Sequence, residues 1–210
     1  MRDPASSPRP GVRVPHPIEV ESYAILRSRL DTADLPPLTR AVVERVVHTS
    51  ADPSWAGDLV CDEGALRAGR AALLAGAPLV TDVRMVAVGV TARASTVALE
   101  LADEPIEEAE QAPTRSAAGI RAAARRYPVG AVWAIGNAPT ALAELLRCAA
   151  AGLLDTPLVV GLPVGFVGAV AAKAALRAAG LPAVSNRTER GGAAVAAAAV
   201  NALLYAEVDP

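Results

Sequence analysis

The chain has 210 residues, 52% of them hydrophobic and 20% charged, so it is long enough for one compact domain with a sizeable core. The formal net charge of −2 and the absence of a Lys/Arg run exclude a general attraction to nucleic-acid phosphates. Only 3% of the residues are aromatic, which also argues against a platform for stacking bases. The core must therefore be built from Ala, Val and Leu.

Neither the apolar stretches nor the cysteines indicate a membrane or an oxidising compartment. Residues 156–172 are interrupted by Pro157, Pro163 and several glycines, and residues 193–206 are too short to cross a bilayer, which takes about 20 apolar residues. Cys61 and Cys148 are far apart and belong to no paired motif, so we expect neither a disulfide nor a zinc site. The N-terminal residues lack the apolar run of a signal peptide. We therefore expect a cytoplasmic protein.

The first 50 residues predict a leader followed by two helices. Residues 1–17 are rich in Pro, Arg and Ser and are predicted to be a flexible leader, which precedes a single domain over residues 18–210. Apolar residues at helical spacing predict a helix over residues 18–30. After the break at Pro36 and Pro37, the same spacing predicts a second helix that begins near Leu38. His48 lies in the last turn of that helix.

From residue 58 onwards, short apolar runs alternate with longer alanine-rich segments. The runs predict strands at residues 58–61, 78–81, 96–101, 131–135, 157–160 and 182–185. The segments between them predict helices at residues 63–75, around Met85, and at residues 115–126, 140–151, 166–179 and 192–204. Residues 58–81 are interpreted as a βαβ unit. The alternation predicts an α/β fold of three layers, α/β/α, in which a mostly parallel sheet carries helices on both faces.

Residues 102–113 are acidic and contain Pro105 and Pro113. We expect a solvated surface loop here, because runs of like charge are usually solvated. A metal site is the less favoured alternative.

Glycine-rich turns at residues 136–140, 161–168 and 190–192 follow predicted strands and open helices. In open parallel sheets, ligands bind beyond the carboxyl ends of the strands, and free N–H groups at such turns favour anions such as phosphate or carboxylate. The spacing of Gly161, Gly165 and Gly168 fits neither a Walker A loop nor G-x-G-x-x-G. The alternative is that the glycines only permit tight turns, and the sequence leaves both readings open.

His48 is the first candidate for acid–base chemistry. It is one of only two histidines, and histidine is the side chain that ordinarily titrates near neutral pH. The other histidine, His16, lies in the leader and is assigned no role. The alternative for His48 is that a histidine in the last turn of a helix only complements the helix dipole.

A series of short motifs, taken together and in order, resembles one family. The motifs are ESYAILR at 21–27, RVVH at 45–48, AGAP at 75–78, TDVRMVA at 81–87, GVT at 89–91, TRSAA at 114–118, IGNAPTAL at 135–142, LPVGFVGA at 162–169 and RGG at 190–192. Over roughly residues 18–204 the chain is similar to precorrin-8X methylmutase and its cobalt-precorrin-8 counterpart, which act in cobalamin biosynthesis.

The resemblance implies a flavodoxin-like fold and a homodimer with active sites near the subunit interface. It implies an isomerase that moves a methyl group from C11 to C12 of a tetrapyrrole polycarboxylate, without a cofactor and without consuming S-adenosylmethionine. The product would be hydrogenobyrinic acid, or cobyrinic acid from the cobalt form. Hand-over of the product to a neighbouring enzyme of the cobalamin pathway would be in keeping with this role.

The resemblance also assigns roles to residues around the first candidate. It makes His48 the proton donor or acceptor and places Ser22 and Arg45 in contact with the substrate. Arg45 precedes His48 by three residues, so the two share a helix face. The guanidinium of Arg45 is then expected to hold a peripheral acetate or propionate of the substrate.

Four more residues match family positions or helix starts where a substrate carboxylate is expected. Thr91 and Arg115 are expected to line the pocket, although a plain surface arginine at a helix start is the alternative for Arg115. Asn137 and Thr140 either donate to a carboxylate or cap the helix that follows them.

Some positions depart from the family pattern. Arg84 stands where many members have an acidic residue, Pro113 replaces a common asparagine, and residues 185–190 contain fewer arginines than the usual version. The departures leave open whether the substrate is metal-free or carries cobalt.

The alternative function is that of a carrier, which would bind a corrinoid intermediate and pass it on with little turnover. Both functions need the pocket, but only the isomerase needs His48 to titrate. An oxidoreductase or kinase is disfavoured because the nucleotide-binding fingerprints are missing.

Overall fold

The structure is a computed structural model that describes residues 16–103 and 114–206. Its helices are α1 (Pro17–Arg29), α2 (Pro37–Ser50), α3 (Trp55–Asp58), α4 (Glu63–Leu74), α5 (Arg84–Gly89), α6 (Arg115–Arg126), α7 (Pro139–Ala150), α8 (Ala169–Ala178) and α9 (Ala193–Tyr205). Its strands are β1 (Leu59–Cys61), β2 (Leu79–Thr81), β3 (Thr96–Val97), β4 (Val132–Ile135), β5 (Val159–Gly161) and β6 (Ala183–Asn186). Residues 1–15 of the predicted leader and residues 104–113 of the predicted acidic loop lie outside the described ranges.

The sheet confirms the predicted flavodoxin-like arrangement. Its order is β1-β6-β5-β4-β2-β3, and the pairs from β6 to β3 are all parallel. The five parallel strands have the order 2-1-3-4-5 along the chain, which is the order of flavodoxin. Strand β1 is added at the edge and runs antiparallel to β6, with Leu59 opposite Asn186. The predicted βαβ unit at residues 58–81 was therefore wrong, because β1 neither neighbours nor parallels β2.

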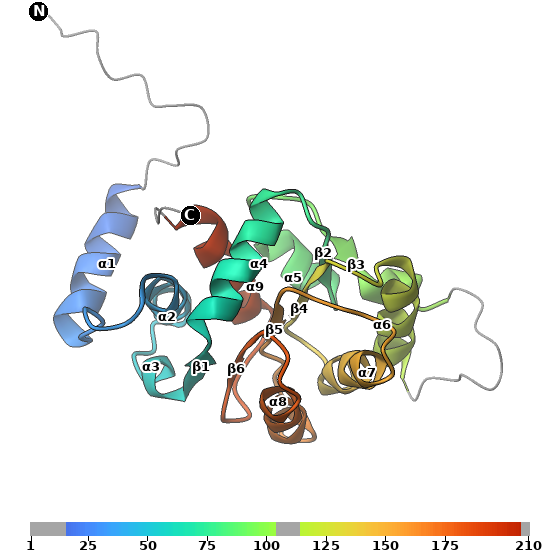
Figure 1. The fold of residues 1–210 in the computed structure, drawn as a ribbon. Coiled ribbons are helices and arrows are strands. Elements are labelled where there is room, and N and C mark those ends of the chain that lie inside the picture. The colour runs from blue at the N-terminus through green and yellow to red at the C-terminus, as the bar shows by residue number, and fades with distance from the viewer. Residues whose placement is uncertain (1–15, 104–113, 207–210) are drawn as a thin grey trace, which may run out of the picture.

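Alternate residues of the central strands build two cores, one on each face of the sheet. In β4, Val132 and Ala134 belong to one core, whereas Trp133 and Ile135 belong to the other, as the twofold side-chain period of a strand requires. Helices α2, α4, α5 and α9 cover the first face, and α6, α7 and α8 cover the second (Figure 1). The three-layer prediction is thus confirmed.

Two local predictions were wrong for identifiable reasons. The strand expected over residues 96–101 ends at Val97 and continues as a 3₁₀-helix, Ala98–Leu101. This short helix packs on α6 at Gly119, where a Cβ atom would lie 2.3 Å from the carbonyl oxygen of Ala98. The helix expected from residue 166 begins only at Ala169, because Gly168 precedes it in the left-handed region with φ of 81°.

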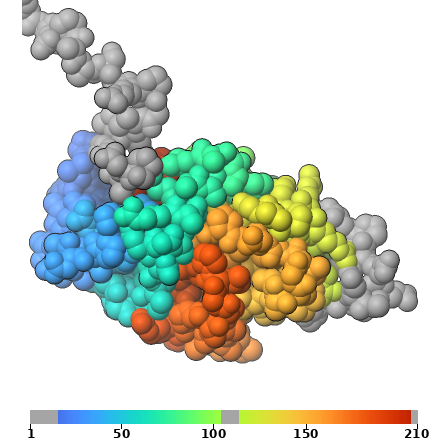
Figure 2. Space-filling model, in the orientation of Figure 1, coloured from blue at the N-terminus to red at the C-terminus, as the bar shows by residue number. Residues whose placement is uncertain are grey.

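Helix α1 lies at one end of the molecule, on the outer side of α2. In Figures 1 and 2 the blue N-terminal helices are at the opposite end from α6 and α7. The imidazole Nδ1 of His16 accepts a hydrogen bond from the N–H of Ile18 and so caps α1. Leu26 is the buried residue of this helix, so α1 contributes little to either core. No helix within the described ranges is long and apolar enough to cross a membrane.

Candidate functional site

His48 occupies the last turn of α2, as predicted. The helix ends at Ser50, and Ala51 stops it by adopting the left-handed conformation. The Nδ1 atom of His48 lies 2.8 Å from the hydroxyl oxygen of Ser22 on α1, so one predicted substrate contact is hydrogen-bonded to the predicted acid–base residue. No residue in the described ranges hydrogen-bonds to Nε2. That nitrogen is therefore the ring atom available to a ligand.

A small cavity lies beside this pair. Ser22, Arg29 and His48 border it together with apolar side chains that include Val47 and Pro53. Its volume is about 120 Å³, whereas pockets for whole ligands usually measure about 300–1,000 Å³. The cavity can take one peripheral group of a large ligand, and the remainder would have to lie outside it.

Arg45 belongs to a neighbouring polar cluster. Its guanidinium forms an ion pair with Glu19 of α1 at 2.9 Å, and both side chains are largely buried, with exposed fractions of 15% and 12%. The same guanidinium lies 5.7 Å from the ring centroid of Tyr205. The Tyr205 hydroxyl is 3.0 Å from Oγ1 of Thr91, whose N–H donates to Asn201. Tyr205 thus brings together Arg45 and Thr91, two of the predicted contacts.

Arg115, Asn137 and Thr140 form a separate group at the starts of α6 and α7. Arg115 pairs with Asp103 at 2.8 Å, and both side chains are exposed. In Figure 1 these helix starts belong to the end of the molecule away from α1 and α2. Within the described residues, no hydrogen bond or ion pair joins this group to His48 or Arg45.

Thr140 and Asn137 do not cap α7. The residue before that helix is Ala138, and no side chain makes a cap hydrogen bond there, so the capping alternative was wrong. The hydroxyl of Thr140 instead accepts a hydrogen bond from Thr114 at 3.1 Å. Thr140 also borders an apolar groove of about 680 Å³ between α7 and α8. The groove offers few polar groups to a polycarboxylate.

The turn between β4 and α7 already holds an anion, the side chain of Asp82. This carboxylate follows β2 directly and accepts hydrogen bonds of 2.7–3.1 Å from the N–H groups of Val83, Gly136, Asn137 and Ala138. Burial raises the pKa of Asp82, and the four N–H bonds offset part of that rise. The site lies between β2 and β4, where flavodoxin-like sheets commonly bind ligands. Here the expected anion-binding turn is occupied by the protein itself.

The other glycine-rich turns support the alternative of tight turns. A Cβ atom on Gly191 would lie 2.4 Å from the carbonyl oxygens of Leu162 and Pro163. Only glycine allows these two turns to approach so closely.

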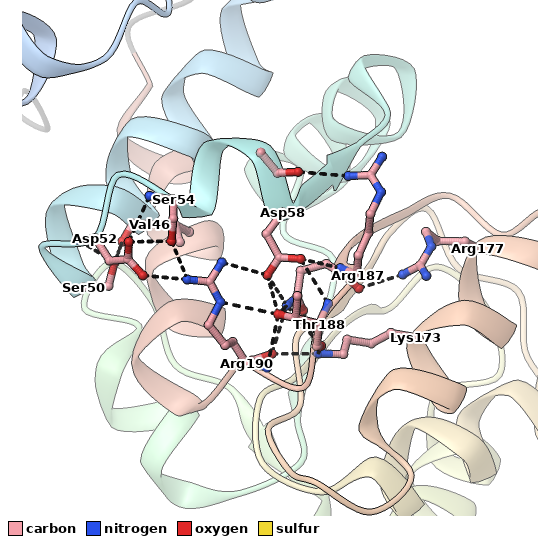
Figure 3. Close-up of polar contacts among 12 residues, drawn as sticks. Val46, Ser50, Asp52, Ser54, Asp58, Lys173, Arg177, Arg187, Thr188 and Arg190 are labelled. Carbon is pink, nitrogen blue, oxygen red and sulfur yellow. Dashed lines mark hydrogen bonds and ion pairs between the residues drawn. The ribbon is translucent and has the colours of Figure 1, made fainter.

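A partly buried polar network joins residues 52–58 to residues 186–190 (Figure 3). The Asp58 carboxylate accepts hydrogen bonds from Asn186, from the N–H and hydroxyl of Thr188, from the N–H of Arg187 and from Arg190. Burial alone would raise the pKa of Asp58, but these hydrogen bonds outweigh it and lower the pKa to about 2. Arg190 also bonds to Asp52 at 2.6 Å. The network ties β1 and the segment after His48 to the end of β6.

Lys173 of α8 also belongs to this network and contacts residues 186–190. It is fully buried, and its ammonium donates to Oδ1 of Asn186 at 2.8 Å and to the carbonyl of Arg190 at 2.7 Å. Burial lowers the pKa of Lys173 to about 8. Because its acceptors lie at the end of β6 and in the segment that follows, Lys173 fixes that segment to the strand.

The sequence analysis missed Asp82, Lys173 and Asp58. Asp82 carried a signal, since an acidic residue directly after a buried parallel strand lies at the edge where the N–H groups of the turns gather. Lys173 is the one charged residue within residues 169–176, which also marks it. The partners of Asp58 are about 130 residues away along the chain, and no local pattern indicates them.

Comparisons with known proteins agree with this fold. The sequence model of the family described as precorrin-8X methylmutase matches residues 17–206. The chain is 43% identical to a precorrin-8X methylmutase of Pseudomonas aeruginosa, covering 87% of this chain and 91% of that protein. It is 37% identical to a cobalt-precorrin-8 methylmutase of Methanothermobacter thermautotrophicus, covering 85% and 86%. A crystal structure of the precorrin-8X methylmutase of Thermus thermophilus superposes with a TM-score of 0.78 at 33% identity, covering 89% of this chain and 93% of that one. The chain therefore belongs to the precorrin-8X methylmutase family, a family of isomerases that move a methyl group within one molecule.

Proposed function

We propose that this chain moves the methyl group of precorrin-8X, or of cobalt-precorrin-8, from C11 to C12 in cobalamin biosynthesis. The observation that carries the proposal is the His48–Ser22 pair beside a small cavity in a chain of this family. The hydrogen bond at Nδ1 orients the imidazole and leaves Nε2 for the substrate.

In the proposed reaction, His48 donates a proton to the conjugated macrocycle and later takes it back. The bond from the methyl group to C11 breaks while a bond to C12 forms, so substrate and product have the same atoms. Protonation of the ring system by Nε2 would favour the shift, and the proton returns to His48 when conjugation is restored. The imidazole ends each turnover in the state in which it began.

Arginines near His48 would bind the peripheral carboxylates. Arg29 borders the same cavity, and Arg45 lies one helical turn before His48. A guanidinium binds carboxylate in a bidentate manner. Arg45 would exchange Glu19 for a substrate group, since its ion pair with Glu19 at 2.9 Å shows that the guanidinium can hold a carboxylate at this position.

A homodimer would explain why the predicted contacts fall into two groups. The His48 cavity is too small for a macrocycle, and Arg115, Asn137 and Thr140 are not among the residues that line it. We propose that the Arg115 group of one subunit faces the His48 group of the other. Each site would then contain residues from both chains.

Mixing two inactive variants tests this arrangement. His48→Ala and Arg115→Ala are purified separately and then exchanged into mixed dimers. If the two residues serve one site from different subunits, the mixture recovers about a quarter of the wild-type activity, because half of the dimers are mixed and each has one intact site. No recovery, with subunit exchange shown by mass, would contradict a shared site.

The assay of the proposed function follows the visible spectrum after the protein is mixed with an excess of precorrin-8X or of its cobalt form. We expect product to accumulate over many turnovers with at least one of the two substrates. A spectral change that stops at one equivalent of protein would indicate a carrier instead. An unchanged spectrum with both substrates would overturn the proposal.

We propose that the enzyme works in the cytoplasm. Cys61 and Cys148 are both free thiols, and burial raises the pKa of Cys61 to about 12 and also raises that of Cys148. Thiols that remain protonated are unreactive, so both cysteines can stay reduced and free, as is usual in the cytoplasm.

A further inference from the structure

We propose that Tyr23 is a positioning residue that fixes the ring plane of His48, a role that rests on the proposed function. The Tyr23 and His48 rings are stacked, with centroids 4.9 Å apart and an angle of 11° between their planes. This geometry is that of offset stacking, which is favourable beyond the area that it buries.

The imidazole needs this second contact. Rotation of a histidine ring about its last side-chain bond has broad energy wells, and the hydrogen bond between Nδ1 and the Ser22 hydroxyl constrains only one ring atom. A flat ring in face contact restricts the tilt that this hydrogen bond leaves free. Together, Ser22 and Tyr23 define both the edge and the plane of the imidazole, and hence the direction in which Nε2 points.

Tyr23 is itself in contact with Arg27, which lies one turn later on α1. The guanidinium carbon of Arg27 lies 5.6 Å from the Tyr23 ring centroid, within the range of a cation–π contact. Arg27 in turn donates to both carboxylate oxygens of Glu44 on α2, at 2.7–3.2 Å.

Glu44 anchors this chain of contacts in the interior. Its side chain is only 4% exposed, and it also accepts a hydrogen bond of 2.6 Å from Thr32. Burial alone would raise the pKa of Glu44, but the hydrogen bonds from Arg27 and Thr32 outweigh it and lower the pKa. The carboxylate therefore stays charged and keeps Arg27 in place over Tyr23.

The contacts matter because little else holds α1. Leu26 is its buried residue, so the placement of Ser22 relative to His48 depends on the polar and aromatic contacts between α1 and α2. Tyr23 does not border the cavity beside His48. It would act through the imidazole and not on the substrate.

The test compares Tyr23→Leu, which removes the ring, with Tyr23→Phe, which keeps it. The first readout is the NMR signals of the His48 ring protons, which a stacked ring shifts upfield. The chain has only two histidines, so His48→Ala assigns the signals. The second readout is kcat and KM with precorrin-8X, and thermal unfolding confirms that each variant is folded. If Tyr23→Leu does not fold, Tyr23→Met replaces it.

We expect Tyr23→Leu to lose the upfield shift and about tenfold or more in kcat, with KM changed less than about twofold, because misplacing a reacting group slows chemistry more than binding. Tyr23→Phe should keep both the upfield shift and the wild-type kcat, because it keeps the ring. A Tyr23→Leu enzyme with wild-type kcat, beside an inactive His48→Ala enzyme, would overturn the positioning role and leave the proposed function intact. Full activity of His48→Ala would contradict both the positioning role of Tyr23 and the proposed function of His48. An absent upfield shift in the wild type would contradict the stacking of the two rings.

Discussion

The switch point of the sheet and the end of α2 are both polar sites, but they differ in what occupies them. At the switch point, the Asp82 carboxylate accepts four backbone N–H groups and is almost completely buried. At the end of α2, one nitrogen of His48 is bonded to Ser22, and a cavity lies beside the ring. The usual ligand position of the fold is therefore filled by the protein, and the candidate chemistry lies outside it.

The contrast teaches that the fold indicates the usual position of a ligand, but it does not show whether a given chain leaves that position open. The polar groups that the protein itself does not use indicate where this chain can bind a ligand. Filled sites such as those of Asp82 and Asp58 should contribute mainly to stability. The open site at His48 should contribute little to stability and strongly to activity, in line with the usual trade-off between the two. Substitutions at the two kinds of site can break or sharpen this distinction.

The largest effect on stability is expected for Asp82→Ala. The free energy of unfolding should fall by about 3 kcal/mol or more, because a buried N–H group without an acceptor costs about 1–3 kcal/mol. Urea unfolding measures the loss, and Asp103→Ala, which removes an exposed aspartate, is the control with little expected change.

The same variant tests whether Asp82 fills an anion site. Formate should raise the Tm of Asp82→Ala more than chloride does at equal ionic strength, since a ligand that binds only the folded state stabilises it. The wild type should show no such difference. A variant as stable as the wild type would contradict the role of the four hydrogen bonds.

A smaller effect, with a marked pH dependence, is expected for Asp58→Asn. The pKa of Asp58 is about 2 in the folded protein, below its ordinary value of about 3.9 in an unfolded chain. The ionised form is thus favoured by folding, so its contribution of about 2 kcal/mol is present above about pH 4 and is lost as the pH falls towards 2. Urea unfolding between pH 5 and pH 2 should show a steeper loss for the wild type than for Asp58→Asn. Parallel curves would be inconsistent with this account.

The smallest effect on stability is expected for Glu19→Gln, which removes the partner of Arg45 beside the open site. The loss should be below about 1 kcal/mol, because the glutamine keeps an amide oxygen that can accept from Arg45, and Arg45 keeps its contact with Tyr205. Thermal unfolding measures it. A loss above about 2 kcal/mol would show that this pair contributes to stability as Asp82 and Asp58 are expected to do. The distinction between filled sites and the open site at His48 would then be weaker.

The element pattern was predictable from the sequence because each strand and helix has its own apolar period. Helix α6 was predicted with its observed bounds, Arg115–Arg126. The mostly parallel sheet was predicted, but the antiparallel direction of β1 was not, since the three residues Leu59–Cys61 carry no mark of parallel or antiparallel pairing. The short helix α3 was missed for a similar reason, because four residues are too few to show a helical period.

The candidate site was predictable only in part. The position of His48 in its helix followed from spacing, whereas the expected roles of His48 and Ser22 rest on the family resemblance and stay predictions. The hydrogen bond between Ser22 and His48 joins residues 26 positions apart. The spacing of apolar residues along the sequence does not indicate such a contact. The pairing of Arg45 with Glu19 was also unpredictable, because it depends on how α1 crosses α2.

The central claim is that His48 performs the acid–base step, and His48→Ala tests it most directly. The variant is mixed with precorrin-8X and followed by visible absorbance, with His16→Ala as the matched control. We predict a rate at least about 100-fold below the wild type, a free energy of unfolding within about 1 kcal/mol of it, and normal turnover by His16→Ala. Turnover by His48→Ala at the wild-type rate would contradict the account.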